Sequence, residues 1–188
     1  MNKNLKKSLI ILFAFLTHYI LLKEYLFSIR WLIAFIKPSY LRSLCFQLIC
    51  IIPVIAAMFL LGKPKAILKS VGLSKGILLG IGIAVACSLP MIIGNAIIGT
   101  LNKDIKLHTI FSSVIYAGFF EELVFRGFLF GMLFRYCRWG FIPAALVGAL
   151  MFGAGHLYQG SDLMFALASF GVTGLGAIWC SWMYAEWS

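Results

Sequence analysis

Of the 188 residues, 62% are hydrophobic and only 12% are charged, and the mean hydropathy is +1.00. A soluble domain is roughly 45–50% apolar and about 25% charged, so this composition excludes a water-soluble globular protein. The net charge of +10 does not indicate nucleic-acid binding, because the basic residues form short clusters between apolar runs and no basic stretch is interleaved with aromatic residues. We therefore expect one integral membrane domain over residues 1–188, with membrane lipid as a partner and no nucleic acid.

The apolar runs approach the ~20 residues that one membrane-spanning helix needs, and they predict an all-α transmembrane helix bundle of about six spans. The first run extends from residue 8 to about residue 36 but contains Lys23, Glu24 and Arg30. We expect it to be a tilted or broken span, or a span followed by an interfacial helix. The other five spans are predicted over residues 44–61, 76–101, 108–134, 141–157 and 163–184.

The distribution of basic residues between these spans predicts an orientation. With six spans and a cytoplasmic N-terminus, nine basic residues flank the spans on the inside and four on the outside. The nine are Lys3, Lys6, Lys7, Lys63, Lys65, Lys69, Lys75, Arg135 and Arg138; the four are Lys37, Arg42, Lys103 and Lys106. By the positive-inside rule we expect a multi-pass protein of a cell membrane, of the bacterial inner or plasma membrane kind, with both termini in the cytoplasm.

Three ionisable residues lie within the fourth predicted span: Glu121, Glu122 and Arg126. A charge at the centre of such a helix costs at least ~2.5–3.5 kcal/mol on insertion scales, so each needs a reason. Glu122 and Arg126 are four residues apart and can form an ion pair on one helix face. Glu121 lies about 100° further round the helix and is left for another role. Without other polar groups nearby, a structural salt bridge would explain the pair.

The fifth predicted span ends at His156, on a helix that Gly148, Gly153 and Gly155 make thin. Missing side chains beside a polar group make room for another helix, a water molecule or a substrate backbone. Histidine exchanges protons near neutral pH, although a lone histidine in this position is more often a polar cap near the membrane interface. Together, Glu121 and His156 predict a hydrolytic site in which the glutamate is the general base on water and the histidine protonates the leaving amine.

The remaining polar residues within or beside the spans have simpler interpretations. His18 and His108 lie near predicted helix ends and are interpreted as interfacial. Asp162 is expected to start the sixth helix. Asn95 is expected to form a hydrogen bond with a neighbouring helix.

Glu121-Glu122-x-x-x-Arg126, followed by Phe152-x-x-x-His156, resembles the CPBP family of CAAX proteases and bacteriocin-processing enzymes. Weaker matches are Val71-Gly72-Leu73 and Gly171-x-x-Gly174-x-Gly176, and the resemblance covers a core of residues 69–184. It implies an all-helical, glutamate-dependent intramembrane protease that needs no catalytic metal and no cofactor. In that family the first glutamate and the histidine activate the water, which corresponds to Glu121 and His156 here. The second glutamate and the arginine correspond to Glu122 and Arg126.

The sequence departs from the family pattern after His156. Members usually carry a last helix with a second histidine and, four residues on, an asparagine or similar residue, which are thought to stabilise the oxyanion. No histidine follows His156 in this sequence. Asn95, Gln159 and His108 are candidates to replace the missing donors.

We favour an intramembrane endopeptidase that hydrolyses a membrane-anchored or lipidated peptide or protein. The first alternative is a catalytically inactive protein of the same fold, which acts as a bacteriocin-immunity or peptide-binding protein. A second is a small transporter subunit that uses Glu121 and His156 as a proton relay. A metal hydrolase with Glu121, Glu122 and His156 as ligands is less favoured, because one histidine and two adjacent carboxylates are poor zinc ligands.

Overall fold

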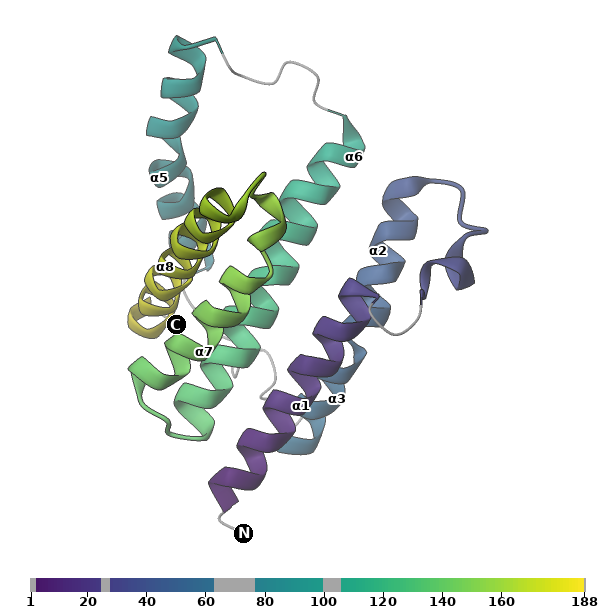
Figure 1. The fold of residues 1–188 in the computed structure, drawn as a ribbon, viewed down its shortest axis with the longest axis vertical. Coiled ribbons are helices and arrows are strands. Elements are labelled where there is room, and N and C mark those ends of the chain that lie inside the picture. Colours follow the sequence, from purple (N-terminus) through teal and green to yellow (C-terminus); the bar gives the residue numbers. More distant parts are fainter. Residues whose placement is uncertain (1–2, 25–27, 63–76, 100–105, 188) are drawn as a thin grey trace.

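The computed structural model describes residues 3–24, 28–62, 77–99 and 106–187, and in these ranges the chain is helical and has no strand (Figure 1). In chain order the elements are α1 (Lys3–Lys23), the 3₁₀ turn η1 (Arg30–Ile33), α2 (Ser39–Cys50), α3 (Ile52–Leu61), α5 (Ile77–Ile97), α6 (Leu107–Ile110), the π-helical segments η3 (Phe111–Phe120), η4 (Leu123–Phe130) and η5 (Met132–Tyr136), α7 (Phe141–Ala154), the 3₁₀ turn η6 (Leu157–Gln159) and α8 (Leu163–Trp187).

Each of the six predicted apolar runs contains helix, which confirms an all-α membrane bundle. Among the described residues, four helical stretches are long and apolar enough to cross a membrane: Lys3–Lys23, Ser39–Leu61, Phe141–Gln159 and Leu163–Glu186. The third and fourth predicted spans are not among these four. The third corresponds to α5, and the fourth to a helical segment from Leu107 to Tyr136 that π-helical turns divide. We call this last segment the motif helix, because it carries the E-E-x-x-x-R sequence.

The first apolar run is broken after Lys23 and does not form one continuous helix. Helix α1 ends at Lys23, and Glu24 follows with a positive φ of 53°, a conformation that ends a helix. The Glu24 carboxylate then accepts hydrogen bonds from the Ser28 hydroxyl at 2.8 Å, the Ile29 amide at 3.1 Å and Arg30 Nε at 2.9 Å. These bonds hold the short turn η1 beside the end of α1.

The motif helix lies at the centre of the bundle and contributes more residues to the main core cluster than α1, α3 or α7 does. Phe128, Leu129 and Phe130 are fully buried, and core residues of α1, α3 and α7 pack in the same cluster. Figure 1 shows α7 and α8 on one side of this helix and α1 with α3 on the other. Edge-to-face contacts of Phe125 with Phe15 of α1 and with Phe152 of α7, at 5.1 and 5.0 Å between ring centroids, link the two sides.

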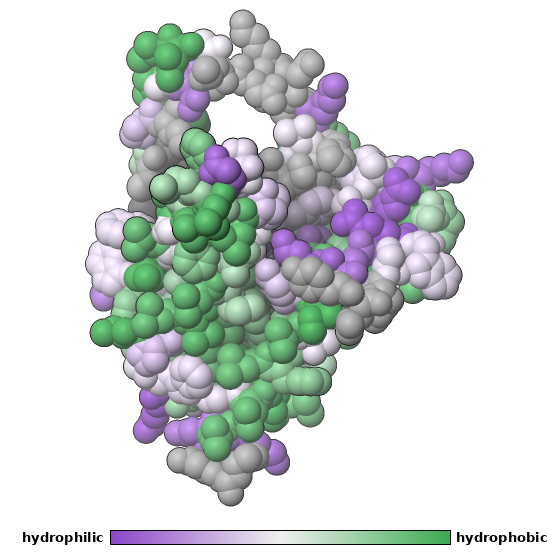
Figure 2. Space-filling view, viewed as in Figure 1, coloured by the Kyte–Doolittle hydropathy of each residue, from purple (hydrophilic) through white to green (hydrophobic). Residues whose placement is uncertain are grey.

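The surface divides into an apolar body and a hydrophilic corner. Most of the face drawn in Figure 2 is hydrophobic, as a lipid-facing surface requires, whereas hydrophilic side chains gather beside α2 and η1. Within this corner, Arg30, Ser39, Arg42 and Ser43 line a cavity of about 570 Å³. A polar route into the bundle is therefore present at this end.

Candidate active site

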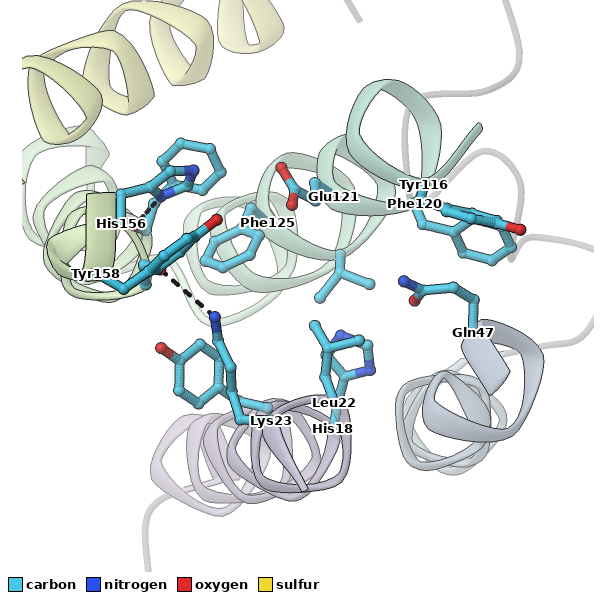
Figure 3. Close-up of a pocket in the computed structure, with 14 residues that line it drawn as sticks. His18, Leu22, Lys23, Gln47, Tyr116, Phe120, Glu121, Phe125, His156 and Tyr158 are labelled. Atoms are coloured by element: carbon cyan, nitrogen blue, oxygen red, sulfur yellow. Dashed lines mark hydrogen bonds between the residues drawn. The ribbon is translucent and has the colours of Figure 1, made fainter. Parts of the chain in front are cut away.

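A cavity opens where α1 and α7 end, against the middle of the motif helix (Figure 3). Its volume is about 80 Å³, which is enough for water molecules. Residues from α1, α2, the motif helix and the end of α7 line it: His18, Tyr19, Leu22, Lys23, Gln47, Tyr116, Phe120, Glu121, Val124, Phe125, Phe152, Gly155, His156 and Tyr158. Two of the four site residues predicted from the sequence, Glu121 and His156, are therefore on the wall of one cavity.

Glu121 and Glu122 face different surroundings although they are adjacent. Glu121 is half-buried on the cavity wall, and Glu122 does not line that cavity. Glu122 Oε1 instead lies 3.0 Å from Nη1 of Arg126, whose side chain is only 6% exposed. The i,i+4 spacing thus forms the predicted ion pair and turns the second carboxylate away from the first.

The backbone around Glu121 departs from regular α-helix. The Glu121 amide donates to the carbonyl of Tyr116, five residues earlier, so the preceding turn is of the wider π type. The residues after Glu122 are again π-helical. Such widened turns within helices occur frequently at functional sites, because they change the direction of the side chains that follow.

His156 lies directly after α7, whose C-cap residue is Gly155. Its Nδ1 is 2.7 Å from the carbonyl oxygen of Phe152. Since a carbonyl only accepts, Nδ1 must carry the proton, and the neutral ring then has a lone pair on Nε2. The ring lies 4.5 Å from that of Phe152 and 6.5 Å from that of Tyr158. The histidine is therefore held in one tautomer with its second nitrogen able to accept a proton.

Arg126 contacts both the motif helix and α7. It does not line the cavity, and its guanidinium lies 4.5 Å from the centre of the Phe152 ring. Its Nε has no hydrogen-bond partner among the described residues. The cation is therefore held by the Glu122 carboxylate and the aromatic face, and it links the motif helix to α7.

Groups on three elements interact electrostatically with Glu121. In order of their effect they are His156 after α7, Arg126 on the motif helix and Lys23 at the end of α1. Figure 3 shows the His156, Glu121 and Lys23 side chains directed toward the same space from three sides. A carboxylate, an imidazole and an ammonium group around a water-sized cavity can together activate water and stabilise developing charge.

The N-terminal helices supply several cavity residues that the motifs did not identify. His18, expected at the interface, is instead 5% exposed within α1, and its Nδ1 lies 2.7 Å from the carbonyl of Cys50. Lys23 and Gln47 also line the cavity. The only sequence signal for Lys23 was its position as a charge that interrupts an apolar run.

Other sequence predictions for this region have mixed outcomes. Asn95 and Gln159, two of the proposed substitutes for the oxyanion donors, do not line this cavity, and the side chain of the third, His108, lies outside the described part of the chain. Asp162 does start α8 as predicted, because its Oδ1 accepts a hydrogen bond from the Phe165 amide at 3.0 Å. Among the described residues, no three His, Cys, Asp or Glu side chains are grouped as metal ligands would be.

Comparison with known proteins finds a match for the C-terminal segment that carries the motifs. Residues 104–187 match the family described as type II CAAX prenyl endopeptidase Rce1-like. No curated protein and no solved structure matches the chain. The matched segment contains Glu121, Glu122, Arg126 and His156, and it begins after α1, α2 and α5. The protein is therefore a membrane protein in which residues 104–187 are similar to the Rce1-like type II CAAX prenyl endopeptidases.

Proposed function

We propose that the protein is an intramembrane endopeptidase that hydrolyses a membrane-anchored or lipidated peptide. One observation carries the proposal. Glu121 and His156, which are 35 positions apart in the sequence, line one cavity of water-accommodating size, while Glu122 is occupied by Arg126. The site thus holds one carboxylate for chemistry and a second for structure.

In the proposed reaction, the Glu121 carboxylate takes a proton from a water molecule. At the same time the water oxygen bonds to the carbonyl carbon of the substrate amide. The resulting tetrahedral intermediate carries negative charge on the former carbonyl oxygen. Nε2 of His156 relays the proton from Glu121 to the amide nitrogen, and the carbon–nitrogen bond breaks. The products are a carboxylic acid and an amine, and Glu121 and His156 return to their starting protonation states.

Water can reach this site through the hydrophilic corner of the molecule. The cavity of about 570 Å³ beside α2 and the site cavity share Leu22, Gln47 and Tyr116 as wall residues, so the two spaces adjoin. Arg30, Arg42 and two serines line the outer cavity, which favours water over lipid there. This arrangement supports hydrolysis at a site otherwise surrounded by apolar helices.

The proposal is tested with purified protein in detergent and in liposomes, using an internally quenched prenylated peptide that ends in a CAAX sequence. Glu121→Gln should lower turnover at least 10²-fold, the minimum effect of a general base, while elution volume and melting temperature stay unchanged. Glu186→Gln, which removes an exposed carboxylate at the end of α8, is the matched control and should keep full activity. Undiminished cleavage by Glu121→Gln would remove the glutamate from the mechanism.

The inactive alternative gives a different result in the same assay. If the protein is a peptide-binding or immunity-type member of the family, the wild type binds the prenylated peptide without cleaving it. Glu121→Gln then leaves both binding and the cellular phenotype intact. A wild type that cleaves no prenylated peptide but binds it in liposomes would therefore replace the protease proposal.

We also propose a multi-pass arrangement in a cell membrane with the N-terminus in the cytoplasm. Several basic residues predicted on the inside gather at one end of the bundle: Trp139 Nε1 donates to the Ser8 hydroxyl at 2.9 Å, which brings Lys6 and Lys7 near Arg138. Arg135 lies over the ring of Tyr184, 4.7 Å away, so the end of α8 is at the same side. Fluorescent-protein and alkaline-phosphatase fusions to each terminus test the orientation, and phosphatase activity at either terminus would contradict it.

A further inference from the structure

Hydrolysis of an amide places negative charge on the carbonyl oxygen, and the cavity must hold a donor that meets this charge. Removal of one such donor typically lowers kcat by about 10²–10³. The inference below rests on the proposed function and identifies the group that takes this role.

Three hydrogen-bond donors on the cavity wall already point at backbone carbonyls. Nδ1 of His18 bonds to Cys50 O at 2.7 Å, and Nδ1 of His156 bonds to Phe152 O at 2.7 Å. The hydroxyl of Tyr116 donates to Tyr40 O at 2.6 Å. In their neutral forms, both histidines therefore present a lone pair, not a proton, from their second nitrogen.

Lys23 is different because its ammonium has three donors but, within the described part of the chain, only one weak hydrogen bond. Nζ lies 3.5 Å from Gly155 O, at the long limit for such a bond. It also lies 5.2 Å from the centre of the Tyr158 ring and 5.8 Å from that of Tyr19. The ammonium is thus held between the ends of α1 and α7, on the cavity wall, with donors left for another acceptor.

The charge of Lys23 is also directed toward the reacting groups. It acts electrostatically on Glu121, and its hydrogen-bond acceptor Gly155 is the residue before His156. Arg126, which also interacts electrostatically with Glu121, does not line the cavity and is paired with Glu122. Among the described residues, Lys23 is the only lysine or arginine on the wall of this cavity.

We propose that Lys23 is a catalytic residue, whose ammonium group binds the oxyanion of the tetrahedral intermediate. As water attacks, the carbonyl π-electron pair moves onto the oxygen, and Nζ–H donates to it without giving up its proton. When the carbon–nitrogen bond breaks, the carbonyl double bond re-forms and this hydrogen bond weakens. The N-terminal helix, which lies outside the family match, therefore completes the active site.

The Gln47 amide is a further polar group on the wall of this cavity. It lines the cavity from α2, on the other side from Lys23 in Figure 3. No hydrogen bond to its side chain is present among the described residues.

A purely structural role for Lys23 must be separated from this catalytic one. A lysine beside the last carbonyls of α7 can stabilise that helix through its charge, which would affect folding and not turnover. Lys23→Met removes the charge and keeps the length, and Lys23→Arg keeps a charge. Lys37→Met, an exposed lysine that lines none of the described cavities, is the matched control.

The first experiment measures kcat and KM of these variants on the quenched prenylated peptide. Lys23→Met should lower kcat about 10²–10³-fold and change KM less than about 3-fold, and Lys23→Arg should recover at least one tenth of wild-type kcat. Lys37→Met should match the wild type. The inference would be overturned if Lys23→Met kept the wild-type kcat. It would also be overturned if the whole loss of activity followed from a lower melting temperature.

A binding experiment tests Lys23 without turnover. A phosphinic analogue of the peptide carries a negatively charged tetrahedral centre in place of the scissile amide. The wild type should bind it more tightly than Lys23→Met by about the factor seen in kcat, whereas the uncharged amide peptide should bind both equally. Equal affinity of both proteins for the phosphinate would overturn the assignment. A wild type that cleaves no peptide yet shows this charge-dependent difference would refute the protease proposal while leaving Lys23 as the anion-binding group.

Discussion

Glu122 and Arg126 form an ion pair at 3.0 Å, in which the arginine is buried and the glutamate is about half exposed. The pair has the i,i+4 order that favours attraction on a helix, and it keeps the second carboxylate away from the cavity that Glu121 lines. Its proposed role is to neutralise a cation that the bundle must hold beside Phe152.

Removal of one partner should therefore be worse than removal of both. Glu122→Gln leaves the buried guanidinium without its counter-charge, and we expect a lower melting temperature in detergent. Glu122→Gln/Arg126→Met should recover part of the loss, with a coupling free energy of about 1 kcal/mol, as for polar pairs in other membrane proteins. Thermal unfolding of the four proteins of this double-mutant cycle checks the prediction, and strictly additive effects would contradict it.

The approach of α7 and α8 depends on Gly153. A Cβ atom at this position would lie 2.8 Å from the carbonyl oxygen of Phe170 and 2.9 Å from its ring. Gly153→Ala should therefore push α8 away, and we expect destabilisation of about 1–3 kcal/mol, as for other overpacked sites. Gly148→Ala on the same helix is the control, because a Cβ there meets nothing within 4 Å. Chemical denaturation in mixed micelles measures the free energy of unfolding of both variants. Equal stability of the two variants would rule out the close contact.

Local sequence patterns predicted the parts of the site that lie on one helix. Apolar runs indicated the helices, the four-residue spacing indicated the Glu122–Arg126 pair, and Asp162 was correctly expected to start α8. These features depend on the periodicity of the helix and on short-range hydrogen bonds. They need no knowledge of how the helices pack.

The cavity wall from the N-terminal half could not be predicted in the same way. Lys23 contacts Gly155 across 132 positions of sequence, and His18 bonds to Cys50 across 32. Both contacts depend on how α1 docks against α7 and α2, and no motif in the sequence records that docking. The interpretation of His18 as interfacial failed for this reason, since its partner is a backbone carbonyl of another helix.

The turn after α1 should respond to acid through Glu24. Burial raises the pKa of the Glu24 carboxyl. Hydrogen bonds from Ser28 and from the backbone of Arg30 and Ile29, together with the charge of Arg30, lower this pKa by a larger amount. The folded-state pKa is therefore below the usual 4.5, and the stabilisation is present above about pH 4.5 and lost as the pH falls through the folded value. Glu24→Gln should have a lower melting temperature than the wild type at pH 7. Its melting temperature should also fall less than that of the wild type on acidification.

Ser28→Ala provides the intermediate case for this turn. It removes one hydrogen bond to Glu24 but keeps the carboxylate and its Arg30 partner. Its acid loss of stability should therefore begin at a higher pH than that of the wild type. Melting curves between pH 3 and pH 7 compare the three proteins, and identical acid profiles would show that Glu24 does not stabilise the turn.

The start of α8 depends on one side-chain hydrogen bond. Asp162 Oδ1 accepts from the Phe165 amide at 3.0 Å, which satisfies one of the backbone donors that the first turn of a helix leaves open. Asp162→Ala should lower stability by about 1 kcal/mol, and Asp162→Asn should lose much less, because asparagine caps helices almost as well. Ser161→Ala, next to it in the chain, is the control and should be neutral. Because α8 packs along α7, hydrogen exchange of the first turn of α8 should increase in Asp162→Ala alone, and unchanged exchange would show that other contacts hold this helix end.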